Sequence, residues 1–333
     1  MKRLEILFAF IITILFFLAS LSCTSGDKGD ASDPLFVAIG MSNIITSTDG
    51  DTWLPAASMP QFSSGLRDVA YDVSGRWIAV GGSAGVVMHT STDGLNWVDV
   101  DDTATNSDLW GVAYGNGLWV SGDMFTGDII HSADGETWTI ASSVPLGINQ
   151  VRGFCYANGL WVGVGAGTDS IIKSDDGDVW VTASSVPSGL GLLYDVCFGN
   201  GLWVAVGAGN EFFISSDGDT WTVPDTVPQV TDTVYDVHYA SGLWVAVAEI
   251  EVDHGILHSL DGNTWVATNS VPSGVAELHG VTHGNGRWVA VGIATRTPPL
   301  EAVVLHSSDG NTWVAAAMFP DETVGLNGIT FRP

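Results

Sequence analysis

The sequence predicts an all-β chain that folds as a seven-bladed β-propeller of four-stranded blades. The pattern Ser-x-Asp-Gly-x-x-Trp recurs along the chain at intervals of 41 to 48 residues. Its aspartates are Asp49, Asp93, Asp134, Asp176, Asp217, Asp261 and Asp309. A period in the forties with several short strand signals is typical of a four-stranded propeller blade, whereas the coils of most solenoids are shorter. The 41 Gly and 14 Trp residues agree with β-strands joined by tight turns.

Each residue of this pattern suits a tight turn between the third and fourth strands of a blade. The Ser and Asp side chains accept hydrogen bonds from turn amides, Gly supplies a positive φ, and Trp brings a large apolar surface. The copy at residues 132–138 resembles the Asp-box of sialidase-type (BNR) propellers, with one residue fewer between Asp and Trp than the commonest form. In that family the box lies on the face away from the active site, so the resemblance implies a scaffold and no chemistry.

The beginning of the chain predicts export. A basic tripeptide and the apolar run Ile6–Leu21 are typical of a secretory signal peptide, here over residues 1–22. The segment 20–23 resembles a bacterial lipobox, although Ser20 and Leu21 exchange the residue types usually found there. The resemblance implies a lipidated Cys23 and a polar, lipid-anchored tether over residues 23–33. The alternative is an uncleaved membrane anchor, because the run is nearly long enough to span a bilayer. In either case we expect an extracytoplasmic, membrane-anchored protein, and a bacterial lipoprotein if Cys23 is lipidated.

The propeller is expected over residues 34–333, and its repeat begins inside a blade. Leu35–Gly40 matches the second strand of the later units and Asn43–Ser47 the third. The missing first strand is found near the other end, at Leu326–Phe331. The two ends of the propeller therefore share one blade, which closes the ring and protects strand edges.

One complete unit shows the expected order of strands. The first three strands are Tyr235–Tyr239, Leu243–Val247 and Ile256–Ser259, and the fourth starts at Trp265. Asn-Gly turns in four other units are strong hairpin signals between first and second strands. Antiparallel order places these turns and the Asp-boxes at one end of every blade, here called the bottom. The loops between second and third strands and the connections between blades are expected at the top, where variable loops suit binding.

The charge of the chain restricts its partners. The net charge is −27, from 37 acidic and 10 basic residues, so nucleic acid and bare anionic lipid are unfavourable partners. Cations, basic proteins and neutral glycans remain, and a surface kept soluble by charge is the simpler alternative. We expect a monomer that contacts the membrane through its lipid anchor and that needs neither a cofactor nor a metal.

One off-pattern tryptophan reveals a candidate binding site. Thirteen of the 14 Trp residues occupy repeat positions, and Trp110 is the exception, near the top of a first strand. The equivalent positions of the seven blades hold Arg67, Trp110, Arg152, Tyr194, Tyr235, His279 and Asn327. Because first strands line the channel, we predict that this ring surrounds its upper mouth and binds an anionic or hydroxyl-rich ligand. The alternative is that these side chains pack between blades.

Three other groups of residues are expected to be structural. One strand position before the Asp-box holds His131, His258 and His306, and a position shared with Gly in other blades holds Asp68, Asp195 and Asp236. We expect strand histidines and carboxylates that bond neighbouring amides. Cys155 and Cys197 occupy equivalent positions of adjacent blades, which we expect to be too far apart for a disulfide. The acidic residues Glu249, Glu251 and Asp253 of one top loop could hold a cation, but a solvated charge cluster is the simpler interpretation.

Three functions are compatible with this sequence. The first is a non-enzymatic propeller that binds a glycan or a protein on its top face. The second is a sialidase-like glycoside hydrolase, whose roles would fall to Arg67, Arg152, Arg296, Tyr194 or Tyr235, Glu277 and Asp68. The third is a surface protein without a specific ligand. We favour the first and assign no catalytic residue, because the Phe-Arg-Ile-Pro signature of sialidases is absent and their propellers have six blades.

Overall fold

The structure, a computed structural model, describes most of the expected propeller. The described residues are 35–61, 65–82, 86–100, 104–105, 108–228, 233–250, 255–296, 300–320 and 323–333. The expected signal peptide, Cys23 and the tether lie outside these residues, as do Glu251 and Asp253. Within the described parts of the chain, no helix is long and apolar enough to cross a membrane.

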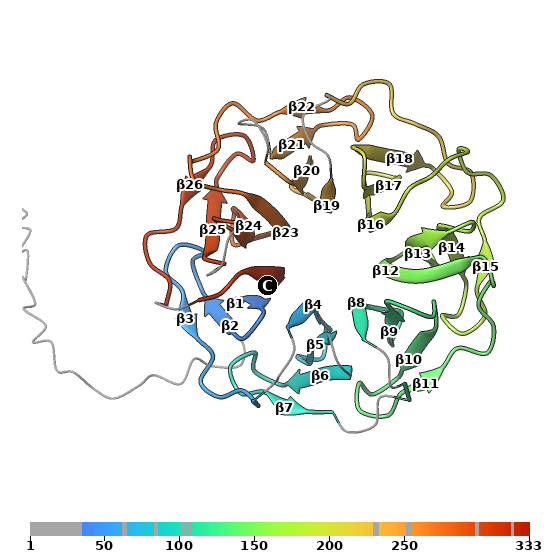
Figure 1. The fold of residues 1–333 in the computed structure, drawn as a ribbon, viewed down its shortest axis with the longest axis horizontal. Coiled ribbons are helices and arrows are strands. Elements are labelled where there is room, and N and C mark those ends of the chain that lie inside the picture. Colours follow the sequence, from blue (N-terminus) through green and yellow to red (C-terminus); the bar gives the residue numbers. More distant parts are fainter. Residues whose placement is uncertain are drawn as a thin grey trace, which may run out of the picture.

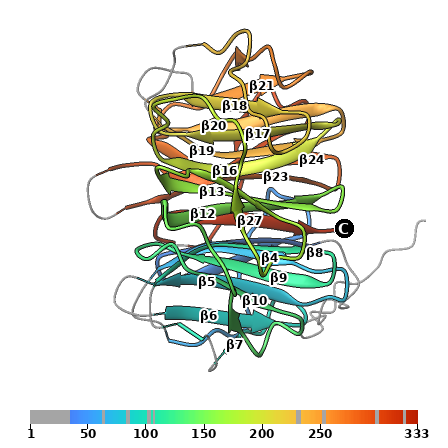
Figure 2. The ribbon, with the colours of Figure 1, turned by 90° about the vertical axis from the view of Figure 1, so that its right-hand side faces the viewer.

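Seven antiparallel sheets stand around a central channel and confirm the predicted seven-bladed propeller (Figure 1). In chain order the sheets are blade 1 (β27-β1-β2-β3), blade 2 (β4–β7), blade 3 (β8–β11), blade 4 (β12–β15), blade 5 (β16–β18), blade 6 (β19–β22) and blade 7 (β23–β26). The strands that line the channel are β4 (Leu66–Tyr71), β8 (Leu109–Gly115), β12 (Ile148–Ala157), β16 (Leu193–Gly199), β19 (Val234–Ala240), β23 (Glu277–Gly284) and β27 (Leu326–Arg332). Figure 2 shows the same ring edge-on.

The remaining strands follow outward from the channel. The second strands are β1 (Leu35–Gly40), β5 (Trp77–Gly82), β9 (Leu118–Asp123), β13 (Leu160–Gly167), β17 (Leu202–Gly207), β20 (Leu243–Ala248) and β24 (Arg287–Ile293). The third strands are β2 (Ile44–Ser47), β6 (Val86–Ser91), β10 (Ile129–Ser132), β14 (Ile171–Ser174), β18 (Glu211–Ser215), β21 (Ile256–Ser259) and β25 (Ala302–Ser307). The fourth strands are β3 (Leu54–Pro55), β7 (Val98–Asp99), β11 (Thr139–Ile140), β15 (Val181–Thr182), β22 (Val266–Ala267) and β26 (Val314–Ala315).

The fourth strands differ from the prediction. Each has only two residues and begins after the box tryptophan, so Trp265 precedes β22 instead of opening it. In blade 5 the fourth strand is reduced to a single bridge between Ile214 and Thr222. Pro224 follows two residues later. Because proline has no amide hydrogen to donate, it cannot extend the ladder there.

The closure of the ring agrees with the prediction. β27 pairs antiparallel with β1, from Leu35 opposite Arg332 to Gly40 opposite Leu326. The side-chain Nδ2 of Asn327 donates to the Leu66 carbonyl oxygen at 2.7 Å, which connects the closing strand β27 to blade 2. Blade 1 is therefore assembled from both ends of the propeller (Figure 1).

The tight turns have the backbone that their residues predict. Asn116, Asn158, Asn200 and Asn285 have φ values between 49° and 54°, and the glycine after each has a φ between 71° and 82°. Two successive positive φ values define the type I′ hairpin turn, which favours Asn-Gly. Ser241 takes the same conformation with a φ of 52°, so blade 6 keeps the turn without asparagine.

The Asp-box turns satisfy their own amides. In blade 3, Gly135 N donates to Ser132 Oγ at 2.8 Å. Glu136 N and Thr137 N donate to Asp134 Oδ1 at 2.9 and 2.8 Å. These backbone hydrogen bonds lower the pKa of Asp134 to about 2, because they stabilise the charged carboxylate. The structural role predicted for the motif is confirmed.

The box also holds the preceding blade, which corrects one prediction. Ser142 follows β11 and donates through its amide and hydroxyl to the Asp178 carboxylate of the blade 4 box, at 2.7 and 2.8 Å. Trp180 N then donates to Ser143 O at 2.8 Å. The fourth strands are so short that each connection between blades begins beside the box of the next blade. Contrary to the prediction, these connections therefore do not lie wholly at the top. Equivalent acceptors after the box glycine are Asp51, Asp219, Asn263 and Asn311.

The core consists of apolar layers between adjacent blades. The layer between blades 4 and 5, for example, joins Val162 and Val164 to Trp203 and Trp221, all at most 2% exposed. At the bottom of the channel, first and second strands place one aromatic pair in every blade, with ring centres 4.5 to 5.1 Å apart. These contacts fix the blades and leave the upper half of the channel to other side chains.

Candidate binding site at the channel mouth

A β-bulge in every inner strand positions the predicted ring. The pairing of first and second strands is interrupted at the top of each blade, by one residue between Leu66 and Asp68 in blade 2 and by two between Leu109 and Val112 in blade 3. A bulge leaves its extra residue unpaired and redirects that side chain. The skipped positions include all seven predicted ring residues, namely Arg67, Trp110, Arg152, Tyr194, Tyr235, His279 and Asn327.

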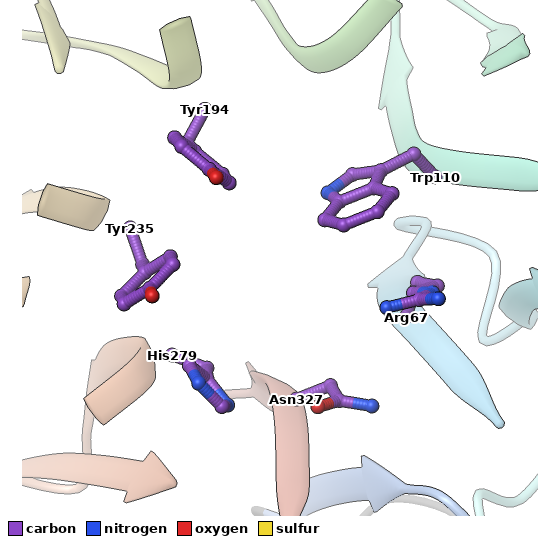
Figure 3. Close-up of a pocket in the computed structure, with 6 residues that line it drawn as sticks. All are labelled: Arg67, Trp110, Tyr194, Tyr235, His279 and Asn327. Atoms are coloured by element: carbon purple, nitrogen blue, oxygen red, sulfur yellow. The ribbon is translucent and has the colours of Figure 1, made fainter. Parts of the chain in front are cut away.

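The structure brings these residues together at one cavity. Six of them line a space of about 280 Å³ at the mouth (Figure 3). Arg152 joins them in lining a second space of about 90 Å³, whose other lining residues include Asp68, Asp195 and Asp236. The seven residues therefore face the channel. Whether they bind a ligand stays a prediction.

One side of the mouth is cationic. The guanidinium carbons of Arg67 and Arg152 lie 4.4 and 3.9 Å from the ring centre of Trp110. Arg152 also lies 4.6 Å from the ring centre of Tyr194 and donates two hydrogen bonds to Gln150 Oε1, at 3.2 and 3.0 Å. Burial lowers the pKa of both arginines, yet a guanidinium remains charged at neutral pH. Stacking on an aromatic face holds the two charges in place.

The opposite side is aromatic. The rings of Tyr194 and Tyr235 meet edge to face with centres 5.1 Å apart, and those of Tyr235 and His279 with centres 4.9 Å apart. His279 Nε2 lies 2.9 Å from Glu277 Oε2, and Nδ1 lies 3.0 Å from the Leu326 carbonyl oxygen. Burial, and secondly the charge of Glu277, raise the pKa of Tyr235, so this phenol stays neutral. Every ring thus has a fixed orientation.

The floor of the site is made of carboxyl groups that accept backbone amides, as predicted, and these amides belong to adjacent blades, which was not predicted. Asp68 Oδ2 accepts Val112 N at 2.9 Å, and Asp236 Oδ2 accepts Val281 N at 2.7 Å. Asp195 likewise accepts the amide of Val237 at 3.1 Å. Burial raises the pKa of Asp68 to about 7 and also raises the pKa values of Asp195 and Asp236. The last two carboxyls hydrogen-bond each other, which requires a proton on one of them.

The same position is glycine in the other four blades, and in blade 3 there is no room for a side chain. A Cβ on Gly111 would lie 1.9 Å from the Arg152 carbonyl oxygen, a contact that no side chain tolerates. Asp and Gly thus give two ways of joining neighbouring inner strands, by a carboxyl bridge or by close backbone approach.

The three histidines that precede the boxes lie in third strands, as expected. His131 and His306 lie in β10 and β25 and pair with box carboxylates of neighbouring blades, Asp178 at 3.2 Å and Asp51 at 3.1 Å. His258 lies in β21. Among the described residues, no group of three or more His, Cys, Asp or Glu side chains could hold a metal ion.

The two described cysteines are free, as predicted. Cys155 packs with the layer between blades 4 and 5, and Cys197 with the layer between blades 5 and 6. The two thiols nevertheless interact, since both lie near the Phe198 backbone and Cys155 is one cause of the raised pKa of Cys197, so they are neighbours that are not bonded. Burial raises the pKa of Cys155 to about 12 and that of Cys197 well above its usual value.

Part of the acidic top loop is paired with an arginine. Arg296 forms ion pairs with Glu249 and with Glu277, the latter at 2.8 Å. Glu277 also pairs with His279 at 2.9 Å. This network connects the top loops of blades 6 and 7 to the ring, and it gives Glu249 a protein partner in place of the cation considered from sequence.

Two features of the site were missed from sequence. The bulges leave only an indirect signal, since a residue that breaks the two-residue alternation precedes the Asp or Gly in each first strand. The clamp between a box and the preceding blade leaves a clearer one, because the residue after the box glycine is Asp or Asn in five blades, at positions 51, 178, 219, 263 and 311.

Comparison with known proteins supports the fold. No family model matches the sequence. No curated protein matches it significantly. Solved structures do resemble it: a protein from Lactobacillus plantarum has a TM-score of 0.66 at 10% identity, over 90% of this chain and 99% of that one. YCF48 bound to a D1 peptide has a TM-score of 0.56 at 17% identity, over 78% and 86%. The WD40 propeller domain of Doa1 has a TM-score of 0.60 at 13% identity, over 87% and 90%.

The fold and the site together define a class. The chain is a seven-bladed β-propeller with an open cavity at the upper mouth of its channel. At identities of 10 to 17% the likeness to these structures concerns the fold alone.

Proposed function

We propose that this protein is a non-enzymatic, membrane-tethered extracytoplasmic propeller that binds a segment of a partner protein at its channel mouth. The observation that carries the proposal is the convergence of seven bulge side chains, one from each blade, on one open cavity. A space of about 280 Å³ suits a side chain or a chain end, and its mixed aromatic and charged lining suits recognition. The tether rests on residues 1–33, where the signal peptide and Cys23 are expected.

The distant neighbour YCF48, bound to a D1 peptide, supports a protein ligand in preference to other ligands. A neutral glycan is the second candidate, because the faces of Trp110, Tyr194 and Tyr235 offer stacking surfaces for sugar rings. A convergent ring of this kind favours binding over a spacer without a ligand.

The glycoside hydrolase alternative receives less support from the geometry. Arg296, needed as a third arginine, is engaged by Glu249 and Glu277. Asp68, needed as an acid, accepts two backbone amides below the ring, those of Val69 and Val112. A sialidase needs both groups free to face its substrate.

Parallel binding to a peptide array and a glycan array tests the proposal. The purified chain is compared with an Arg67→Ala/Arg152→Ala/Tyr235→Ala variant and with Arg76→Ala, which removes a paired charge from the bottom face. We expect saturable peptide binding that is lost in the triple variant and kept in the control. Binding of glycans alone would favour the second candidate. Peptide binding that survives the triple variant would move the site away from the mouth.

A further inference from the structure

We infer that the segment bound at the mouth is zwitterionic, with one carboxylate at Arg67 and Arg152 and basic residues beside it. This inference rests on the proposed function and specifies its ligand. It follows from two opposite charge patterns, one inside the cavity and one on the loops around it.

The cavity contains two arginines without an ion pair. Among the described residues, neither Arg67 nor Arg152 forms a salt bridge, although the charge of Asp108 acts favourably on Arg67. Arg152 donates to Gln150, a neutral side chain, and also interacts with the Tyr194 side chain. The three carboxyls that line the same cavity, Asp68, Asp195 and Asp236, accept backbone amides of adjacent blades and form no ion pair with either arginine within the described residues. A guanidinium offers planar donors that match a carboxylate with two parallel hydrogen bonds.

The loops around the cavity are acidic. Exposed Asp128 and Glu301, together with half-buried Asp169 and Glu211, belong to the top ends of blades 3 to 5 and 7. The top loops contain a single basic residue, Arg296, and two glutamates already balance it. A ligand that enters the mouth must therefore pass negative charge before it reaches the arginines.

The net charge of −27 also opposes a strongly anionic ligand, because the protein as a whole repels negative charge. At physiological ionic strength, charges act over roughly 8 Å, so the rim repels acidic residues next to the anchor and attracts basic ones. One carboxylate with basic neighbours satisfies both the cavity and the rim. That carboxylate is either an acidic side chain or the end of a chain.

The test starts from a displayed library of random dodecapeptides with free C-termini, selected on the purified chain. Enriched peptides are synthesised, and their Kd values are measured by fluorescence anisotropy at two salt concentrations. These are about 50 mM and about 300 mM, because salt screens charge–charge interactions more strongly at the higher concentration. Three altered forms of each peptide are compared: the C-terminal amide, Asp or Glu replaced by Asn or Gln, and Lys or Arg replaced by Gln.

We expect one of the first two changes to weaken binding at least ~10-fold, because a hydrogen-bonded charge is lost. The responsive form identifies the source of the carboxylate. Replacing Lys or Arg of the peptide by Gln should weaken binding and remove most of the salt dependence of Kd. In the Arg67→Gln/Arg152→Gln variant, neutralising the peptide carboxylate should no longer change Kd. The control Arg76→Gln/Lys173→Gln removes the same charge from ion pairs elsewhere, and in it the carboxylate should still matter for Kd.

The outcomes separate the inference from the proposed function. Peptides that bind at the mouth but lack a needed carboxylate, or that are enriched in acidic residues throughout, would overturn the inference and leave the proposed function standing. A library from which no peptide depends on the ring would overturn both.

Discussion

The carboxyl group of Asp68 accepts the backbone amide of Val112 at 2.9 Å, across the boundary between blades 2 and 3. The same carboxyl accepts its neighbour Val69 at 2.7 Å. One side chain thus satisfies two backbone donors and fastens two inner strands next to Arg67, one of the residues that line the channel mouth.

Replacing Asp68 should destabilise the propeller. In Asp68→Ala two amide donors lose their acceptor. Each unsatisfied donor costs about 1–3 kcal/mol, so we expect a clear fall in Tm. Asp68→Asn keeps one acceptor oxygen and should lose less. Calorimetry of both variants checks this, and an alanine variant as stable as the parent would contradict the bridging role.

The contribution of Asp68 to stability should fall as the pH rises from about 4 to about 7, whereas His238, whose pKa burial lowers to about 4, contributes in the opposite direction. The folded pKa of Asp68 is about 7, above its usual 3.8, so the folded state holds a proton that the unfolded chain releases. Raising the pH through this window therefore removes stability, by at most ~1.4 kcal/mol per pH unit for one group. Asp195 and Asp236 act in the same direction. Urea midpoints of the parent and of Asp68→Asn across the window isolate this contribution, and the stability of the parent should fall relative to that of the variant as the pH rises.

Removing the closing strand should abolish cooperative unfolding. Deletion of Asn327–Pro333 takes away most of the pairing partner of β1 and the link to blade 2. Removing residues 1–33, none of which contributes to a described strand, should leave the transition in place. Differential scanning calorimetry distinguishes the two, and an unchanged melting transition in the C-terminal deletion would exclude closure by β27 as a requirement.

The thiols of Cys155 and Cys197 should react slowly in the folded protein. The thiolate is the reactive form, and burial raises the pKa of Cys155 to about 12. In a Cys23→Ser chain at pH 8, iodoacetamide should label Cys155 and Cys197 slowly, and both should react fast in denaturant. Mass spectrometry follows the labelling. Rapid labelling without denaturant would show that the channel leaves the thiols open.

Much of the fold could be predicted because the repeat states its own boundaries. Seven boxes fixed the number of blades, and the first strand displaced to Leu326–Phe331 fixed the closure. The fourth strand was expected to open at Trp265, whereas β22 begins one residue later and has two residues. The length of a fourth strand depends on where the chain meets the next box, as Ser142 meets Asp178, and a single repeat does not contain that contact.

The candidate site was found by aligning repeats, although its geometry was not. The alignment placed Arg67, Trp110 and Arg152 at one position, and the structure places them at one cavity. The stacking of both arginines on Trp110 was beyond prediction, because it depends on bulges that rotate each side chain toward the channel. Bulges arise from the pairing of two strands, and neither strand alone encodes the register.

The shared blade also sets an order of events. β27 is the last described strand to leave the ribosome, and it pairs with β1, the first. Until it is made, β1 has an open edge and the ring of seven side chains lacks Asn327. A chain without β27 therefore presents an unpaired strand and an incomplete mouth, so the closure of the ring and the completion of the seven-residue set depend on the same strand.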